Sequence, residues 1–162
     1  MRLLVLSLCL VGALSPDLAY AEGRVETGYR RGRAFKLRLV TIGWAEVEVA
    51  TARAYREMAK AAERDGIELG IRSGFRSRER QLWLYQAYRA GLGNPAARPG
   101  YSNHESGRAL DLHVDDTTLA WLGKHARRYG FKQTVRGEPW HWEYTPLRRG
   151  ATRRMTATRA PR

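Results

Sequence analysis

Two short segments of the chain hold histidines and carboxylates at spacings that suit a metal site. The first, SNHESGRALDLH at residues 102–113, contains two histidines, a glutamate and an aspartate. The second, EPWHWEY at residues 138–144, places Glu138 three residues before His141. Hydrolytic zinc sites use three protein ligands from His, Asp or Glu and leave a fourth position open for water. The two segments therefore offer ligands for one such site and a further carboxylate for proton transfer.

The histidines do not form a site of the H-E-x-x-H type, because Arg108 occupies the place of that motif's second histidine. A site must be assembled from separate segments. His125 lies among lysine and arginine in a helical pattern, which predicts a solvated surface residue. His141 lies between two tryptophans. By residue type alone, a histidine in such surroundings is more often a core residue than a ligand.

One choice of ligand is ambiguous in the first segment. After Gly107 the residue types alternate, which predicts a strand with Asp111 and His113 on the same face. Chemistry alone favours His113, because a site of three histidines with His104 and His141 is a known arrangement. Two positions along a strand displace a side chain by roughly 6.6 Å, so only one of the pair is expected to be a ligand. The residue types leave both possibilities open.

The order of predicted elements indicates an α+β fold: a small single domain with a central, mostly antiparallel sheet, flanked by about three helices and carrying the metal site in a cleft. Alternation and turn residues predict strands at 34–49 (a pair that turns at 42–44), 67–73, 109–114 and 137–144. Helical spacing and end signals predict helices at 51–66, 77–91 and 117–130, with a loop rich in glycine and proline at 91–103. Leu84, Tyr85 and Tyr88 of the second helix are expected in the core.

The N-terminal residues have the layout of a secretory signal peptide. An apolar run from Leu3 to Leu14 precedes the small residues Ala19 and Ala21. A run of about twelve residues falls short of the roughly 20 needed to span a bilayer. We expect cleavage near Ala21, with residues 1–21 removed and the protein exported to the periplasm or the medium. The only cysteine, Cys9, lies in this segment, so the mature chain would have no disulfide.

The chain is strongly basic, with a formal net charge of +13. We expect the folded domain to occupy residues 22–149 and the arginine-rich residues 150–162 to form a disordered tail. A basic excess attracts polyanions. Because the chain is expected to be exported, anionic wall polymers or lipid head groups are favoured as partners over nucleic acid.

Three sequence motifs, which follow one another in the order found in a known family, resemble the motifs of that family. S-x-H-x-x-G-x-A-x-D at residues 102–111, followed by E-x-x-H at 138–141, closely resembles the zinc D-alanyl-D-alanine carboxypeptidases of the vancomycin-resistance and LAS peptidase group. SGFRSRERQ at residues 73–81 resembles that family's upstream arginine motif. The matching elements run from about Tyr29 to Tyr144.

The resemblance implies one zinc ion per chain, held by His104, Asp111 and His141. It also implies that Glu138 is the general base, which takes a proton from the attacking water and passes it to the leaving amine.

The same resemblance implies that Arg76 is catalytic and contacts the carbonyl or carboxylate of the substrate, with Gln81 and Ser102 as further substrate-binding residues. The implied function is that of a secreted zinc metallopeptidase that cleaves the stem peptide of peptidoglycan by removing a terminal D-alanine. The alternatives are an endopeptidase or D,D-dipeptidase of the same family. A domain without catalytic activity, stabilised by zinc and binding the wall or a polyanion, is a further alternative.

Overall fold

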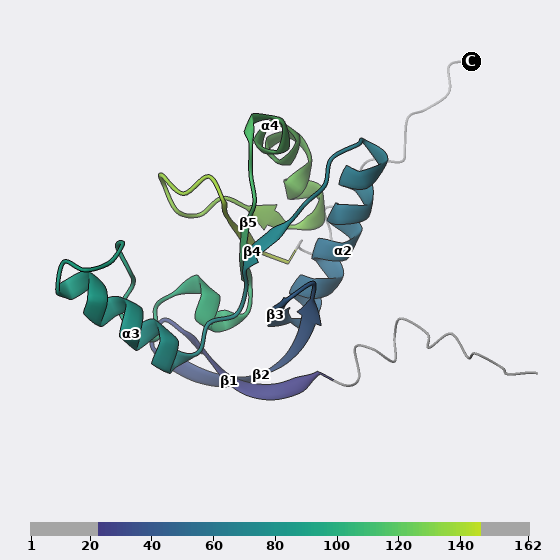
Figure 1. Ribbon diagram of the computed structural model, residues 1–162. Coiled ribbons are helices and arrows are strands. Elements are labelled where there is room, and N and C mark those ends of the chain that lie inside the picture. The colour runs from purple at the N-terminus through teal and green to yellow at the C-terminus, as the bar shows by residue number, and fades with distance from the viewer. Residues whose placement is uncertain (1–22, 147–162) are drawn as a thin grey trace, which may run out of the picture.

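The computed structural model describes residues 23–146, which form helices and antiparallel strands (Figure 1). The strands are β1 (Arg24–Arg30), β2 (Arg33–Ile42), β3 (Ala45–Glu48), β4 (Ile71–Ser73), β5 (Ala109–Leu112), β6 (Phe131–Lys132) and β7 (His141–Tyr144). The helices are α2 (Val49–Arg64), α3 (Arg78–Arg89) and α4 (Asp116–His125), with the short 3₁₀ helices η1 (Asn103–Ser106) and η2 (Ala126–Tyr129). The predicted α+β class is confirmed. The predicted signal peptide and basic tail lie outside the described residues.

The strands form two sheets, where the sequence pattern predicts a single central one. One sheet has the order β1-β2-β3 and the other the order β4-β5-β7-β6, and every strand pair is antiparallel. Strands β1 and β6 are not predicted by the residue pattern. Most side chains of β1 are exposed or only half-buried, and β6 has only two residues. Neither strand therefore shows a clear alternation of apolar and polar residues.

Helix α2 joins the two sheets through a common core. It begins after Glu48, whose carboxylate accepts a hydrogen bond from the Thr51 backbone N–H, and this capping satisfies a free donor of the first turn. Tyr55 and Met58 lie on the buried face of the helix. They belong to one core cluster with residues of β2, β3, β4, β5, α4 and β7. Within residues 23–146, no helix is long and apolar enough to cross a membrane.

Helix α3 lies apart from this core, at one end of the molecule (Figure 1). Its one buried residue is Gln81. The expectation that Leu84, Tyr85 and Tyr88 lie in the core is wrong, because Tyr88 is exposed and the other two are half-buried. The N-terminus of the helix is capped, since the Ser77 hydroxyl accepts a hydrogen bond from the Arg80 backbone N–H.

Gly107 connects η1 to β5 at a point where the two sheets meet. It has a left-handed backbone, with φ of 68°. Its carbonyl accepts a hydrogen bond from the Glu48 N–H, at 3.0 Å. A Cβ atom at this position would lie 2.9 Å from the Glu48 nitrogen and 2.9 Å from Leu37 Cδ1. Both the conformation and the close approach therefore require glycine.

We predict that Gly107→Ala lowers the free energy of unfolding by about 1–3 kcal/mol, because alanine is strained at a positive φ. The control is Gly123→Ala in α4, where an added Cβ meets no atom within 4 Å. That change is expected to be neutral or to stabilise by up to about 1 kcal/mol. Urea denaturation measures the free energy of unfolding of both variants. An unfolding midpoint of Gly107→Ala equal to the wild type would contradict this account.

Candidate metal centre

Strand pairing brings the two histidine-containing segments together. In the second sheet β5 lies between β4 and β7, and Asp111 of β5 is paired with His141 of β7 and with Ser73 of β4. The side chains of Leu110 and Leu112 point the other way and are buried in the core. Asp111 and His141 therefore lie side by side, although 30 residues separate them in the chain.

His104 approaches the same point from η1. Its Nδ1 lies 2.7 Å from the carbonyl oxygen of Gly74. A carbonyl only accepts hydrogen bonds, so Nδ1 carries a proton, and in the neutral ring Nε2 then has a free lone pair. Nε2 lies 3.3 Å from Asp111 Oδ1. In the neutral ring the Nε2 lone pair faces a carboxylate oxygen, an arrangement that a metal ion between the two atoms would stabilise.

His141 completes the group. Its Nδ1 lies 3.0 Å from the same oxygen of Asp111. Its Nε2 is the one buried side-chain nitrogen or oxygen of residues 23–146 that has no hydrogen-bond partner. Nδ1, and not this unpaired nitrogen, is the ring atom that faces Asp111. One ligand atom from each of His104, Asp111 and His141 lies within 4.8 Å of the other two.

The separations suit a zinc ion. Four ligands bound tetrahedrally at about 2.0–2.2 Å lie roughly 3.3 Å from one another. The two distances from Asp111 Oδ1 to the histidine nitrogens, 3.3 and 3.0 Å, are close to this value. Burial opposes ionisation of Asp111, but its contacts with His104 and His141 outweigh burial and hold the pKa of this carboxyl well below its usual range. The donor set of two imidazoles and one carboxylate is one that zinc prefers.

Glu138 lies beside this group without belonging to it. Its backbone carbonyl accepts a hydrogen bond from the His141 N–H, at 3.0 Å, which turns the chain into β7. Its carboxylate is 3.9 Å from His141 Nδ1 and is partly open to solvent. The next residue is held in place, since the Pro139 carbonyl accepts hydrogen bonds from Gln133 Nε2 and from the Trp142 indole.

Arg76 reaches the site from the segment before α3. Its backbone N–H donates to the His104 carbonyl, and its Nη1 donates to Gln81 Oε1 at 2.9 Å. Burial lowers the pKa of the Arg76 guanidinium, and the Asp111 carboxylate opposes that effect. A guanidinium has five N–H donors, so several remain for a ligand.

Gln81 lies inside the protein next to Arg76. It is fully buried, and its Nε2 donates to the Ala97 carbonyl at 2.6 Å while its Oε1 accepts from Arg76. Both ends of the amide are therefore engaged inside the protein. Gln81 therefore positions Arg76 and holds the loop that precedes η1, and its expected contact with substrate stays a prediction.

Glu105 and Ser102 shape the segment that carries His104. The Glu105 carboxylate is fully buried and accepts hydrogen bonds from the Gly100 and Ser102 backbone N–H groups. This role shows in the sequence only as a serine three residues before a glutamate, which is a capping pattern. Ser102 itself is largely buried at the start of η1, and its expected contact with substrate stays a prediction.

The other two histidines lie elsewhere. His113 is exposed beyond the end of β5, with its backbone N–H bonded to the Gly70 carbonyl. His125 is half-buried, and its ring stacks on Trp121 at 4.7 Å between centroids, so it is not the fully solvated residue that the pattern suggests. Neither belongs to the group of His104, Asp111 and His141.

Known proteins resemble the chain in sequence over about half of their own length. A D-alanyl-D-alanine carboxypeptidase of Enterococcus faecalis is 26% identical over 131 residues, covering 62% of this chain and 49% of that protein. YodJ, a putative carboxypeptidase of Bacillus subtilis, is 28% identical over 120 residues, covering 57% of this chain and 44% of that protein.

Solved structures share the fold. VanYB in complex with D-alanine-D-alanine aligns with a TM-score of 0.59 at 22% identity, covering 72% of this chain and 83% of that chain. The LdcB LD-carboxypeptidase aligns with a TM-score of 0.54 at 26% identity, covering 61% and 59%. The family model described as VanY, D-alanyl-D-alanine carboxypeptidase, matches residues 45–147. Because that match extends over more than half of the sequence, the chain belongs to the VanY family of D-alanyl-D-alanine carboxypeptidases.

Proposed function

We propose that this protein is an exported, zinc-dependent D,D-carboxypeptidase that removes the terminal D-alanine from the stem peptide of peptidoglycan. The observation that carries the proposal is the convergence of His104, Asp111 and His141, with the carboxylate of Glu138 beside them. Family membership supports the same reaction class. The leader-like residues 1–21 support export, which would give the protein access to the cell wall.

Zinc is the metal proposed for this centre, with one ion per chain. The donor types, the separations and the tautomer of His104 all fit it. A zinc ion held there would polarise a carbonyl group and lower the pKa of a water molecule from 15.7 to about 7. The Gly74 carbonyl keeps the His104 ring oriented for this task, as partners behind a ligand commonly do in metal sites.

Glu138 is proposed as the general base. Its carboxylate lies next to the ligand group, yet it is more open to solvent than His104 or Asp111. This position supports a role for Glu138 in accepting a proton from the attacking water. The same carboxyl group would then donate that proton to the leaving amine.

Arg76 is proposed to bind the carbonyl oxygen of the scissile bond. Negative charge develops on this oxygen during the reaction. Donors that are already held in place stabilise this charge effectively, because they do not have to reorganise. Gln81 supplies that fixed geometry by holding one Nη atom of the guanidinium.

The choice of scissile bond rests on the relatives. Both curated relatives are named as carboxypeptidases, which favours removal of a single terminal residue. The fold also occurs in the D,D-dipeptidase VanXYg and in an L,D-carboxypeptidase. A D,D-dipeptidase or an endopeptidase is therefore the second candidate, and a binding protein without catalytic activity is the third. The net charge of +13 supports an additional attraction to anionic wall polymers or lipid head groups.

The metal ligands can be tested by elemental analysis of purified protein. We predict one zinc ion per chain in the wild type and loss of zinc and activity in Asp111→Ala. His113→Ala is the matched control and should keep its zinc, because His113 lies outside the ligand group. The assignment would be overturned if His113→Ala lost the metal while Asp111→Ala retained it.

Glu138→Gln should keep the metal and lose turnover by a factor on the order of 10² to 10⁴, because an amide cannot accept the proton of the attacking water. Glu57→Gln makes the same change at an exposed site on α2 and should leave kcat unchanged. Steady-state kinetics with zinc content measured on the same samples tests both. Near-normal kcat in Glu138→Gln would remove this residue from the mechanism.

The reaction itself can be tested with a stem pentapeptide that ends in D-alanyl-D-alanine. We expect mass spectrometry of the products to show the loss of one alanine, and chelation of the metal to abolish that loss. Release of a dipeptide would identify a D,D-dipeptidase instead. No product from several stem peptides would favour a binding protein.

A further inference from the structure

Helix α3 and the loop that follows it carry a large share of the exposed apolar side chains. Of the eight large hydrophobic residues exposed among residues 23–146, five lie in this segment: Leu82, Trp83, Tyr88, Leu92 and Tyr101. A single exposed apolar side chain needs no explanation, but a concentration of them marks an interaction surface. The helix has one buried residue, so most of its surface is left uncovered by the rest of the protein (Figure 1).

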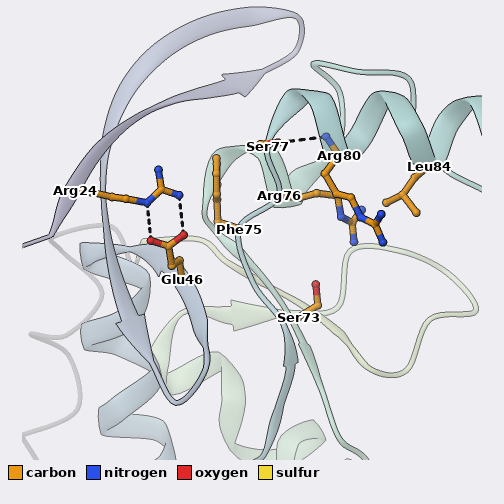
Figure 2. A pocket seen from close by; sticks show the side chains of 8 residues that line it. All are labelled: Arg24, Glu46, Ser73, Phe75, Arg76, Ser77, Arg80 and Leu84. Atoms are coloured by element: carbon orange, nitrogen blue, oxygen red, sulfur yellow. Dashed lines mark hydrogen bonds and ion pairs between the residues drawn. The ribbon is translucent and has the colours of Figure 1, made fainter.

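One side of α3 borders a cavity, and the other side faces away from it. Figure 2 shows Arg80 and Leu84 on the inner side, where they line a cavity of about 460 Å³. Successive residues of a helix are turned by about 100° from one another. Leu82 therefore lies almost opposite Leu84, and Trp83 lies almost opposite the buried Gln81. A partner that binds Leu82 and Trp83 would leave the cavity open.

Leu92 extends the apolar surface at the end of the helix. Its side chain is 84% exposed, the largest value among the eight residues. Its backbone N–H donates to the Ala87 carbonyl at 2.9 Å, which holds the loop against the last turn of α3. Leu82, Trp83 and Leu92 together are called the α3 surface below. They lie at one end of the molecule, away from the core (Figure 1).

Positive charge surrounds the α3 surface. Residues 78–101 contain four arginines and one acidic residue, Glu79. None of the four arginines forms an ion pair with a carboxylate of residues 23–146. The guanidinium of Arg80 lies 4.2 Å from the centre of the Trp83 ring, and that of Arg98 lies 3.8 Å from the centre of the Tyr101 ring. These contacts orient the side chains without cancelling their charge.

An anionic lipid surface matches this combination of side chains. Arginine and tryptophan are favoured at the level of the lipid head groups, and aliphatic side chains insert just below them. A sugar polymer would stack on the aromatic rings but would leave Leu82 and Leu92 without a partner. Helix α3 has 12 residues, which is too short to span a bilayer. The composition therefore indicates docking on a membrane surface.

We propose that the α3 surface docks this protein on an anionic lipid bilayer, with the neighbouring arginines beside the lipid phosphates. The inference rests on the exported location in the proposed function and does not require the peptidase reaction. It assigns part of the net charge of +13 to a defined surface and partner. The cavity beside α3 would then lie close to the membrane, where it stays open to peptide substrates.

Sedimentation of the mature chain with lipid vesicles tests the proposal. We expect binding to vesicles that contain phosphatidylglycerol and little binding to vesicles of phosphatidylcholine alone. Trp83→Gln should weaken the binding roughly 10-fold or more, as expected for the loss of a large buried apolar side chain. The matched control is Trp44→Gln, which changes a tryptophan that is 69% exposed between β2 and β3. It should bind as the wild type does.

Equal affinities of Trp83→Gln and Trp44→Gln would overturn the proposal, because the binding would then come from charge elsewhere in the chain. Equal unfolding midpoints of both variants and the wild type show that each is folded.

A pair of charge variants tests the role of the arginines. Arg89→Gln combined with Arg98→Gln should weaken binding to the anionic vesicles roughly 10-fold or more, since each basic residue at such a surface contributes about 1 kcal/mol. The control combines Arg64→Gln with Arg128→Gln, two exposed positions outside the α3 segment. Screening limits the effect of charges that lie more than about 10 Å from the lipid. An equal loss in both pairs would contradict docking through α3.

Fluorescence quenching by brominated lipid identifies the tryptophan that enters the bilayer. Trp83→Phe should remove most of the quenching, and Trp44→Phe should retain it. Two results would overturn the proposal in favour of another partner. One is weaker binding of Trp83→Gln to a lipid-free wall polymer with unchanged binding to vesicles. The other is a dimer in solution that forms without lipid and is lost in Trp83→Gln.

A chelator separates this proposal from the proposed function, because docking uses no metal. Vesicle binding that depends on Trp83 and persists after chelation would support the docking surface even if the chain cleaved no stem peptide. A chain that cleaves stem peptides but does not bind anionic vesicles would reject the docking surface and leave the proposed reaction intact.

Discussion

The register of β5 between β4 and β7 determines which side chains reach the candidate metal centre. Asp111 is paired with His141 on one side and with Ser73 on the other. Side chains alternate along a strand, so a slip of one residue would replace Asp111 with Leu110 or Leu112. Both leucines are buried in the core that α2 completes, and such a slip would expose them. The packing of the hydrophobic core therefore maintains the geometry of the polar site.

The second constraint acts on η1, which carries His104. A buried carboxylate, that of Glu105, binds the backbone of the preceding turn, and burial raises its pKa while the N–H donors of Gly100 and Ser102 oppose the rise. Strand β1 packs against the same turn. A Cβ added at Gly28 would lie 2.9 Å from the Glu105 carbonyl. The three-stranded sheet thus supports the four-stranded one by holding the segment that carries a ligand.

The sequence predicts which residues form the site better than it predicts the contacts that hold those residues in place. Residue types and spacing are sufficient to select His104, His141 and either Asp111 or His113 as candidate ligands, and the resemblance to the family motif then selects Asp111. The role of Gln81 depends on a contact with the carbonyl of Ala97, 16 residues further along, which no local pattern reveals. Apolar periodicity in α3 predicts burial, yet whether another element covers that face depends on the tertiary fold. Strand β6 is short and strand β1 is largely exposed. Little of either strand is buried on one face only, so their sequences show no clear alternation of apolar and polar residues.

The central claim is that a zinc ion binds between the two histidines and Asp111. Nitrogen NMR of the histidine side chains in zinc-loaded protein tests it most directly, because the signal of a ring nitrogen differs between protonated and metal-bound forms. The structure predicts that His104 binds through Nε2, since its Nδ1 donates to Gly74, and that His141 binds through Nδ1, which faces Asp111. Zinc should leave both ring nitrogens of His113 unbound. Metal-bound signals from His113, or no change at His104 and His141 on addition of zinc, would contradict the account.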